Sequence, residues 1–194
     1  MAWDRTVVLD AKSNCSGEDR PLQRKETYNA PVFPTMKPRH TAAVEIRPAA
    51  PHDIDKMCEF VERLLVKWDA RGTRNDAQRV YEHVLKSPDL GIIFVAENLA
   101  ADKKAELCGF AYASYEWRME FGGETMELVE TFVEESARNA GVGKMLLNAL
   151  IAHGQERGIR RFSCQVHPGN SAIERALESS GLDPERRMVW SLDL

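Results

Sequence analysis

Two glycines, Gly141 and Gly143, stand between an apolar segment and a regular helical pattern in "FVEESARNAGVGKMLLNAL", residues 132–150. A loop that opens a helix presents several N–H groups without intrahelical partners, and the helix dipole adds partial positive charge there. Because glycine has no Cβ, an anion can approach this backbone closely, and Arg138 and Lys144 supply full positive charges nearby. These residues predict an anion site that suits a pyrophosphate better than a single carboxylate.

Two common phosphate-binding loops do not fit this segment. A P-loop ending at Lys144 would need glycine in place of Arg138 and Ser or Thr in place of Met145. A dinucleotide fingerprint starting at Gly141 would need its third glycine in place of Leu146. The bare G-x-G spacing is also compatible with a tight strand-to-helix turn that binds nothing.

The sequence before the loop predicts both helices and strands. Apolar residues recur at three- and four-residue spacing in residues 52–69 and 75–87, which predicts two amphipathic helices. Short apolar runs bounded by proline, glycine or polar turns predict four strands, at 43–49, 91–97, 105–115 and 125–133. A polar turn separates the second strand from the third, so we expect these two to pair as a hairpin.

The sequence after the loop continues this alternation. One apolar helical face begins at Val142, the helix ends at Gly158, and a strand follows at 161–166. A strand-helix-strand unit of this kind makes its two strands parallel. A last helix is predicted over 170–182 with Asn170 as its N-cap, and "RMVWSLDL" predicts a closing strand. The sum is an α/β fold built on a mixed sheet.

Length and composition fit one domain preceded by an arm. The 194 residues are 43% hydrophobic and 29% charged, which allows one domain with a sizeable core. Residues 1–42 hold prolines, charges and turn formers with few apolar anchors, so they cannot bury enough surface to offset their ordering entropy. We therefore predict an extended or mobile arm at 1–42 and a single domain at 43–194. An arm that docks on a partner subunit through "YNAPVFP" is the alternative.

The charge balance argues against a nucleic-acid partner. The formal net charge is −4, and residues 1–44 carry seven basic and five acidic residues. Residues 45–194 therefore hold 19 basic and 25 acidic residues, so the predicted domain is acidic and would repel a phosphate backbone. A homodimer is compatible with the sequence, because the last strand or the arm could exchange between subunits.

No segment predicts a membrane partner, a secretion signal or a metal site. The N-terminus carries charges at Asp4 and Arg5 and has no long apolar run, so we expect a cytoplasmic protein. The four cysteines lie far apart, without a Cys-x-x-Cys pair or a histidine at ligand spacing. Neither a disulfide framework nor a zinc site is therefore predicted.

A longer set of residues around the loop matches a known motif. The set consists of Val133, Arg138, Gly141, Val142, Gly143, Leu146 and Leu147. It resembles the acetyl-CoA motif of the GNAT-type N-acetyltransferase superfamily, R/Q-x-x-G-x-G/A between the fourth strand and the third helix. Downstream, Asn170, Gly181 and Leu182 resemble that superfamily's next motif, an asparagine followed at a fixed interval by glycine and an apolar residue. The resemblance covers residues 45–194 and leaves the arm out.

The resemblance implies a fold and a co-substrate. The implied sheet is mixed but mostly antiparallel and is flanked by about four helices. Its parallel fourth and fifth strands splay apart to form a cleft for acetyl-CoA. By this analogy the pyrophosphate binds the glycine loop, and the pantetheine pairs with the strand that ends at Val133. A free N–H near Phe132 or Val133 would stabilise the thioester oxyanion. The implied cofactor-binding residues are Phe132, Val133, Arg138, Asn139, Ala140, Gly141, Val142, Gly143, Lys144 and Asn170.

Acetyl transfer to an amine needs the amine in its neutral form, although an alkylammonium has a pKa of about 10.4 in water. Residues 116–135 hold seven glutamates and one basic residue, Arg118, and the middle of this window would flank the acceptor side of the cleft. We therefore expect a small-molecule amine that is cationic, such as a polyamine or an aminoglycoside, as the acceptor. The alternative is that these glutamates face water and keep the protein soluble.

Three residues are candidates for the group that removes the proton. Glu130 is the first, because it lies inside an otherwise apolar strand, three residues before the predicted pantetheine contact at Val133. Glu127 is the second. Strand alternation places Glu130 with Leu128 on one face and Glu127 on the other, unless a bulge intervenes. His167 is the third, although a histidine that only caps or fills its loop is the simpler interpretation.

One position departs from the superfamily's pattern. The superfamily commonly has a tyrosine in the last helix, seven residues after the asparagine, which protonates the departing thiolate, and Leu177 stands there in this chain. We expect the thiolate to leave unassisted or to take a proton from water. The alternatives are a proton from Tyr112 or Tyr115 in the third strand, or a domain that is catalytically weak.

Two other functions stay open from the sequence alone. Acetylation of a peptide or protein amine would need an open groove, and a non-catalytic acyl-CoA-binding module would bind the cofactor without releasing thiol. Acceptor specificity would lie in the connections at 67–76 and 116–124, because loops on a rigid scaffold carry most specificity.

Overall fold

The computed structural model describes residues 43–68, 70–99, 105–167 and 169–185 of the chain. The predicted arm at 1–42 and the predicted closing strand at 187–194 lie outside the described residues. The other predicted helices and strands fall inside these ranges and can be compared with the structure.

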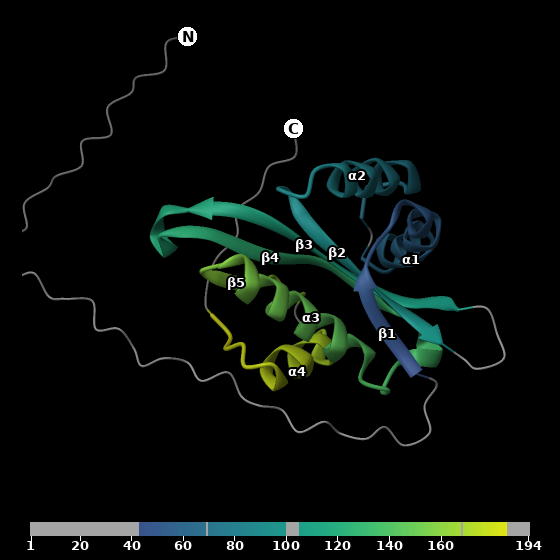
Figure 1. Ribbon diagram of the computed structural model, residues 1–194. Helices are drawn as coiled ribbons and strands as arrows, with labels where there is room; N and C mark the ends of the chain where they lie inside the picture. The colour runs from purple at the N-terminus through teal and green to yellow at the C-terminus, as the bar shows by residue number, and fades with distance from the viewer. Residues whose placement is uncertain (1–42, 69, 100–104, 168, 186–194) are drawn as a thin grey trace, which may run out of the picture. The chain divides into compact units, whose positions relative to one another are not determined.

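Five strands of the described chain form one mixed sheet in the order β1-β2-β3-β4-β5 (Figure 1). The first four strands pair antiparallel with their neighbours, and the short fifth strand runs parallel to β4. The predicted hairpin and the predicted parallel pair are both confirmed. The strands are β1 (Ala43–Pro48), β2 (Gly91–Leu99), β3 (Glu106–Arg118), β4 (Gly123–Val133) and β5 (Arg161–Cys164).

Helices cover both faces of the sheet (Figure 1). On one face lie α1 (Ile54–Lys67) and α2 (Arg74–Lys86), and on the other lie α3 (Val142–Arg157) and α4 (Ser171–Ser179). The apolar stripes read from the sequence form two separate cores, one under each helix pair. The α/β fold class and its four flanking helices are therefore confirmed.

The sequence predicted where α3 ends and where α4 begins, and the structure shows the hydrogen bonds at both places. Gly158 ends α3 in the left-handed conformation with φ 80°, which only glycine adopts without strain, as the pattern predicts. Asn170 occupies the N-cap position of α4, but its side chain makes no capping hydrogen bond. Its backbone carbonyl accepts the amides of Ile173 and Glu174 at 3.1 and 3.2 Å, as the carbonyl of an N-cap residue does. The prediction that Asn170 is the N-cap of this helix is therefore confirmed.

A β-bulge in β4 changes the direction of the candidate bases. Glu130 pairs with Tyr112, whereas Leu128 pairs with the next residue of β3, so Val129 is the extra residue. A bulge shifts strand alternation by one residue. Leu128 therefore packs into the α3 core while Glu130 faces α2, so the exception named for a bulge applies and these two residues do not share a face. Glu127, adjacent to Leu128 and thus opposite to it, lies on the same face as Glu130.

Arg47 connects β1 with the start of α1 and with β2. Its guanidinium group hydrogen-bonds Asp53 at 2.7 and 3.0 Å and Glu97 at 3.1 Å. The Asp53 side chain is only 3% exposed. Burial by itself would raise the pKa of Asp53, but the Arg47 hydrogen bonds and the Ala50 N–H hold that pKa below its usual value.

We expect Arg47→Met to lower the free energy of unfolding by about 3 kcal/mol at neutral pH, because it leaves a buried carboxylate unpaired. Urea denaturation measures this difference. Since the folded-state pKa of Asp53 is lowered, the pair stabilises the fold above the unfolded pKa of about 4 and stops doing so as the pH falls through the folded value. The deficit of the variant should therefore shrink in acid.

Arg79→Met, which breaks an exposed ion pair with Asp76, is the control and should lower the free energy of unfolding by less than about 1 kcal/mol. An equal deficit for both variants would contradict this prediction.

Candidate active site

The glycine loop leaves its backbone open to a ligand. Asn139 and Gly141 take left-handed conformations with φ 62° and 83°, which turn the chain from β4 into α3. A Cβ added to Gly141 would meet nothing within 4 Å, and one added to Gly143 would meet only Val133, at 3.8 Å. Within the described residues, no group accepts the amide hydrogens of Gly141, Val142 or Gly143, as expected for a helix start. The Val142 side chain is buried, so it offers a ligand only its amide.

Beside this loop, one edge of β4 has no neighbouring strand. Pairing between β4 and β5 begins at Thr125 with Arg161 and stops at Leu128 with Cys164, whereas β4 continues to Val133. In the described part of the chain no strand pairs with this edge beyond Leu128. The splay of the fourth and fifth strands that the resemblance implies is therefore present. An extended ligand could add itself to this edge as a strand.

Val133 presents its backbone to the open edge. The next amide, that of Glu134, donates to the Cys108 carbonyl of β3 at 2.8 Å. Because successive residues of a strand point their polar groups to alternate sides, the N–H and carbonyl of Val133 point away from β3. The Val133 carbonyl accepts a hydrogen bond from Nε of Arg138 at 3.1 Å. Phe132 and Val133 were the two residues whose N–H could stabilise the oxyanion, and this geometry favours Val133. The Phe132 side chain packs on Phe60 in the core.

Glu130 lies in a largely apolar niche beneath α2. Its carboxylate accepts a hydrogen bond from the Tyr81 hydroxyl at 2.5 Å, and Tyr81 is 1% exposed. Burial raises the pKa of Glu130, and the Tyr81 hydrogen bond lowers it only in part. A carboxylate with a raised pKa is suited to accept a proton near neutral pH. Tyr81 itself was missed by the sequence analysis, although a phenol on the buried face of an amphipathic helix needs a polar partner.

Glu127 lies where the two strands separate. It is paired in register with Ser163 of β5, one position before the last paired residues. Its carboxylate accepts a hydrogen bond from Nε2 of Gln165 at 2.9 Å, across the start of the gap. The bulge thus places both candidate glutamates on the α1 and α2 side of β4, beside the open edge.

Arginines neutralise much of the glutamate-rich window. Four of its seven glutamates form ion pairs with arginine, three of them with residues outside the window. The pairs are Glu116 with Arg118, Glu124 with Arg157, Glu134 with Arg63, and Glu135 with Arg138. By contrast, the partners of Glu127 and Glu130 are uncharged, namely Gln165 and Tyr81. Beside the open edge of β4, the acidic character of the window therefore depends chiefly on Glu127 and Glu130.

His167 and Asn170 lie on the far side of the gap, in the connection from β5 to α4. The His167 ring is exposed and stacks on Trp68 at 4.6 Å between centroids, at the end of α1. Among the described residues His167 makes no hydrogen bond to either glutamate. Asn170 donates its backbone N–H to the His167 carbonyl at 3.1 Å. The structure thus places Glu127 and Glu130 on the same face of β4 and gives His167 a packing contact.

The tyrosines considered as substitutes for the missing acid lie elsewhere. Tyr115 faces α3, where its hydroxyl hydrogen-bonds Nε2 of His153 at 2.6 Å. Tyr112 faces α2 beside Tyr81, with ring centroids 6.4 Å apart. Leu177 is buried in the core under α3 and α4. The Tyr115 hydroxyl is thus bonded on the α3 side of the sheet, and Leu177 offers no hydroxyl, so the water-protonated thiolate stays a prediction.

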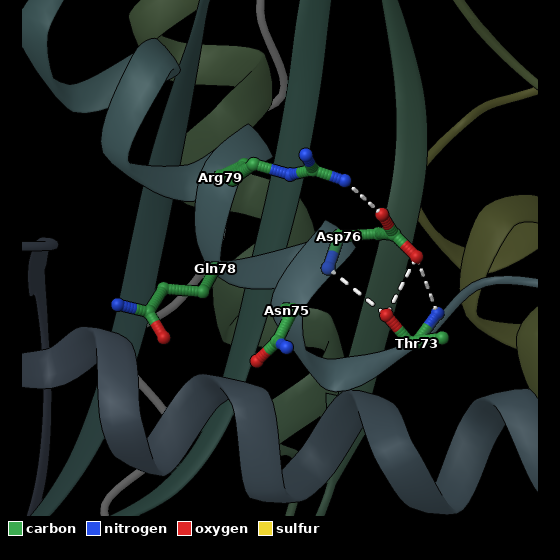
Figure 2. A pocket seen from close by; sticks show the side chains of 5 residues that line it. All are labelled: Thr73, Asn75, Asp76, Gln78 and Arg79. Carbon is green, nitrogen blue, oxygen red and sulfur yellow. Dashed lines mark hydrogen bonds and ion pairs between the residues drawn. The ribbon is translucent and has the colours of Figure 1, made fainter.

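Two open surface hollows lie near the segments predicted to carry specificity. The first, of 520 Å³, is lined by Thr73, Asn75, Asp76, Gln78 and Arg79 at the start of α2 (Figure 2). Its carboxylate is already satisfied, since Asp76 accepts the Thr73 hydroxyl and amide and pairs with Arg79. These contacts lower the pKa of Asp76 to about 2 and cap the helix. The second, of 430 Å³, is lined by Glu116, Arg118, Met119 and Glu120. Neither hollow includes a predicted cofactor or catalytic residue, so we assign neither to the reaction.

An open strand edge that leads into a glycine loop at a helix start is the arrangement expected of a transferase with a long, phosphate-bearing acyl carrier. The model of the acetyltransferase (GNAT) family matches residues 55–181, more than half of the chain. The chain belongs to this family, which confirms the resemblance. It is an acetyl-CoA-dependent acetyltransferase, and acetyl-CoA is its co-substrate.

Several solved structures share this fold at low sequence identity. A possible acetyltransferase from Clostridium difficile 630 is 16% identical, with TM-score 0.66 and coverage of 78% of this chain and 97% of that chain. Aminoglycoside N-acetyltransferase AAC(6')-Iy in complex with CoA is 21% identical, with TM-score 0.64 and coverage of 81% and 99%. The same enzyme with a bisubstrate analog, CoA-S-monomethyl-acetylneamine, is 23% identical, with TM-score 0.62 and coverage of 78% and 99%.

No curated protein sequence matches the chain. Across the described residues, no helix has the length and apolar character that crossing a bilayer requires.

Proposed function

We propose that the protein transfers the acetyl group of acetyl-CoA to the primary amine of a small cationic acceptor, with Glu130 as the general base. The observation that carries this proposal is the placement of Glu130. Its side chain is partly buried, its hydrogen-bond partner Tyr81 is uncharged, and it lies beside the unpaired edge of β4. A carboxylate so placed can take a proton from an ammonium group, directly or through one water.

Each residue of the site has a role in this proposal. Acetyl-CoA supplies a thioester carbonyl as the electrophile. The glycine loop and Arg138 hold the pyrophosphate, the edge of β4 holds the pantetheine, and Asn170 contacts it from the far side. The N–H of Val133 stabilises the oxyanion that forms when the neutral amine attacks. The bond from carbon to sulfur then breaks, the attacking nitrogen gives up its extra proton to water, and the thiolate takes a proton from water.

Glu127 supports a cationic acceptor. It lies on the same face as Glu130, and its hydrogen-bond partner carries no positive charge. One carboxylate can therefore attract and orient an ammonium group while the other removes the proton from the reacting amine. Two of the similar structures are of an aminoglycoside N-acetyltransferase, which supports a cationic amine as the acceptor.

A panel of amines tests this proposal. We expect release of CoA with polyamines and aminoglycosides at a kcat/KM at least tenfold above that of a neutral-chain monoamine, a difference of about 1.4 kcal/mol. Glu127→Gln should raise KM for the polycationic amines with little change in kcat, because it removes ground-state attraction. Glu156→Gln, at an exposed position of α3, is the matched control and should behave as wild type. Mass spectrometry of the products identifies the acetylated amine.

Other outcomes would replace the proposal. Turnover confined to peptide amines would favour a peptide or protein acceptor. Tight cofactor binding without thiol release for any amine would favour a non-catalytic acyl-CoA-binding module. A homodimer and a cytoplasmic location stay predictions of the sequence.

A further inference from the structure

We infer that Tyr81 is a positioning residue that holds the Glu130 carboxylate in its proton-accepting orientation and sets the pH range in which Glu130 can act. This inference rests on the proposed role of Glu130. Tyr81 belongs to α2, whereas Glu130 belongs to β4, so the contact exists only in the folded chain.

The Tyr81 ring has little freedom to turn. It is 1% exposed and packs edge-on against Phe110, with ring centroids 5.9 Å apart and an interplanar angle of 74°. It meets Tyr112 in the same way, at 6.4 Å and 83°. With the ring fixed, the hydroxyl has one direction and donates to Oε2 of Glu130. Oε1 is then the atom of Glu130 that receives the proton from the acceptor.

The other titratable groups around Glu130 carry no positive charge. Cys58 of α1 and Tyr112 of β3 both face it, and burial raises the pKa of each, so both are neutral at neutral pH. Among the described residues packed against Glu130, the hydrogen bond from Tyr81 is thus the interaction that favours the charged carboxylate. Without it, burial alone would determine the titration of Glu130 and would favour the protonated acid.

Tyr81→Phe tests the inference because it keeps the ring and removes only the donor. We expect the acid limb of kcat/KM to move upward by about one to two pH units, the range typical for losing a hydrogen bond to a charged group. Below the limb the rate then falls about tenfold for each pH unit. Tyr112→Phe removes a hydroxyl from the neighbouring ring and is the matched control, for which the limb should stay at the wild-type position. A purely structural role of Tyr81 would lower the melting temperature and leave the limb in place.

A direct titration separates this inference from the proposed function. With glutamate labelled at its carboxyl carbon, NMR follows Glu130, whose resonance is assigned by its absence in Glu130→Gln. The midpoint should rise in Tyr81→Phe relative to wild type and to Tyr112→Phe. If it rises while the kinetic limb does not move, the role of Glu130 as general base fails and the Tyr81 contact stands. If it does not rise, the inference is overturned whatever the kinetics show.

A measurement on wild type covers the case in which Tyr81→Phe does not fold. With tyrosine labelled at its phenolic carbon, the Tyr81 resonance should report the same titration midpoint as the Glu130 carboxyl carbon. A Tyr81 resonance that is constant through that midpoint would contradict the inference.

Discussion

Replacing Glu130 by glutamine is expected to lower kcat by about 10²- to 10⁴-fold, the range for loss of a general base. Glutamine has nearly the same shape and can still accept the Tyr81 hydrogen bond, so the niche beneath α2 should survive. Its amide cannot take a proton from an ammonium group at neutral pH. Steady-state kinetics with a polyamine, together with the affinity for CoA, measure the effect.

The pH profile gives an independent check on Glu130. A general base acts only when deprotonated, so activity falls as the pH drops below its pKa. Because burial raises the pKa of Glu130, the acid limb in wild type should lie above the ordinary glutamate value of about 4.3. In Glu130→Gln this limb should disappear while the affinity for CoA stays unchanged. Wild-type kcat in the variant would show that another group takes the proton.

Replacing Gly143 by tryptophan is expected to abolish stabilisation by CoA and acetyl-CoA. At a ligand concentration about 100 times Kd, binding stabilises a protein by about 2.7 kcal/mol, which thermal unfolding of wild type should detect. In the variant an indole ring would fill the space above the loop and block the first amides of α3. Backbone strain is not expected, because a Cβ at this position meets only Val133, at an ordinary 3.8 Å.

A matched tryptophan separates this local effect from a general one. Gln155→Trp adds the same ring to an exposed position near the other end of α3, and it should keep the full CoA-dependent shift. Both variants should unfold near the wild-type temperature when no ligand is present. A CoA shift retained in Gly143→Trp would mean that the glycines serve only the turn into α3.

Elements with a strong local signal could be predicted from the sequence. The periodic apolar faces of α1, α2 and α3, the alternating apolar strands and the glycine that ends α3 all depend on neighbours within a few residues. The glycine loop belongs to the same class, because a helix start with Gly141 and Gly143 exposes its amides wherever it occurs. For this reason the fold class and the position of the loop agree with the structure.

The candidate catalytic site could be predicted only in part. Glu130 and Glu127 were identifiable as glutamates in an apolar strand, but their common face depends on a bulge at Val129 that strand alternation cannot reveal. Tyr81 is 49 residues away from Glu130 along the chain, so no local pattern connects them. Asn170 was identifiable as the N-cap of α4, although its side chain makes no capping hydrogen bond.

The sequence by itself determined most of the secondary structure of the described residues and the open glycine loop, because each follows from short-range spacing and backbone chemistry. Only the tertiary structure decided which glutamates of residues 116–135 form ion pairs with arginine. Arg63 and Arg157 come from distant helices to neutralise glutamates of the acidic window, while the bulge turns Glu130 toward Tyr81. The charge of a segment is counted along the chain, but its electrostatic effect depends on the partners that folding brings within a few ångströms.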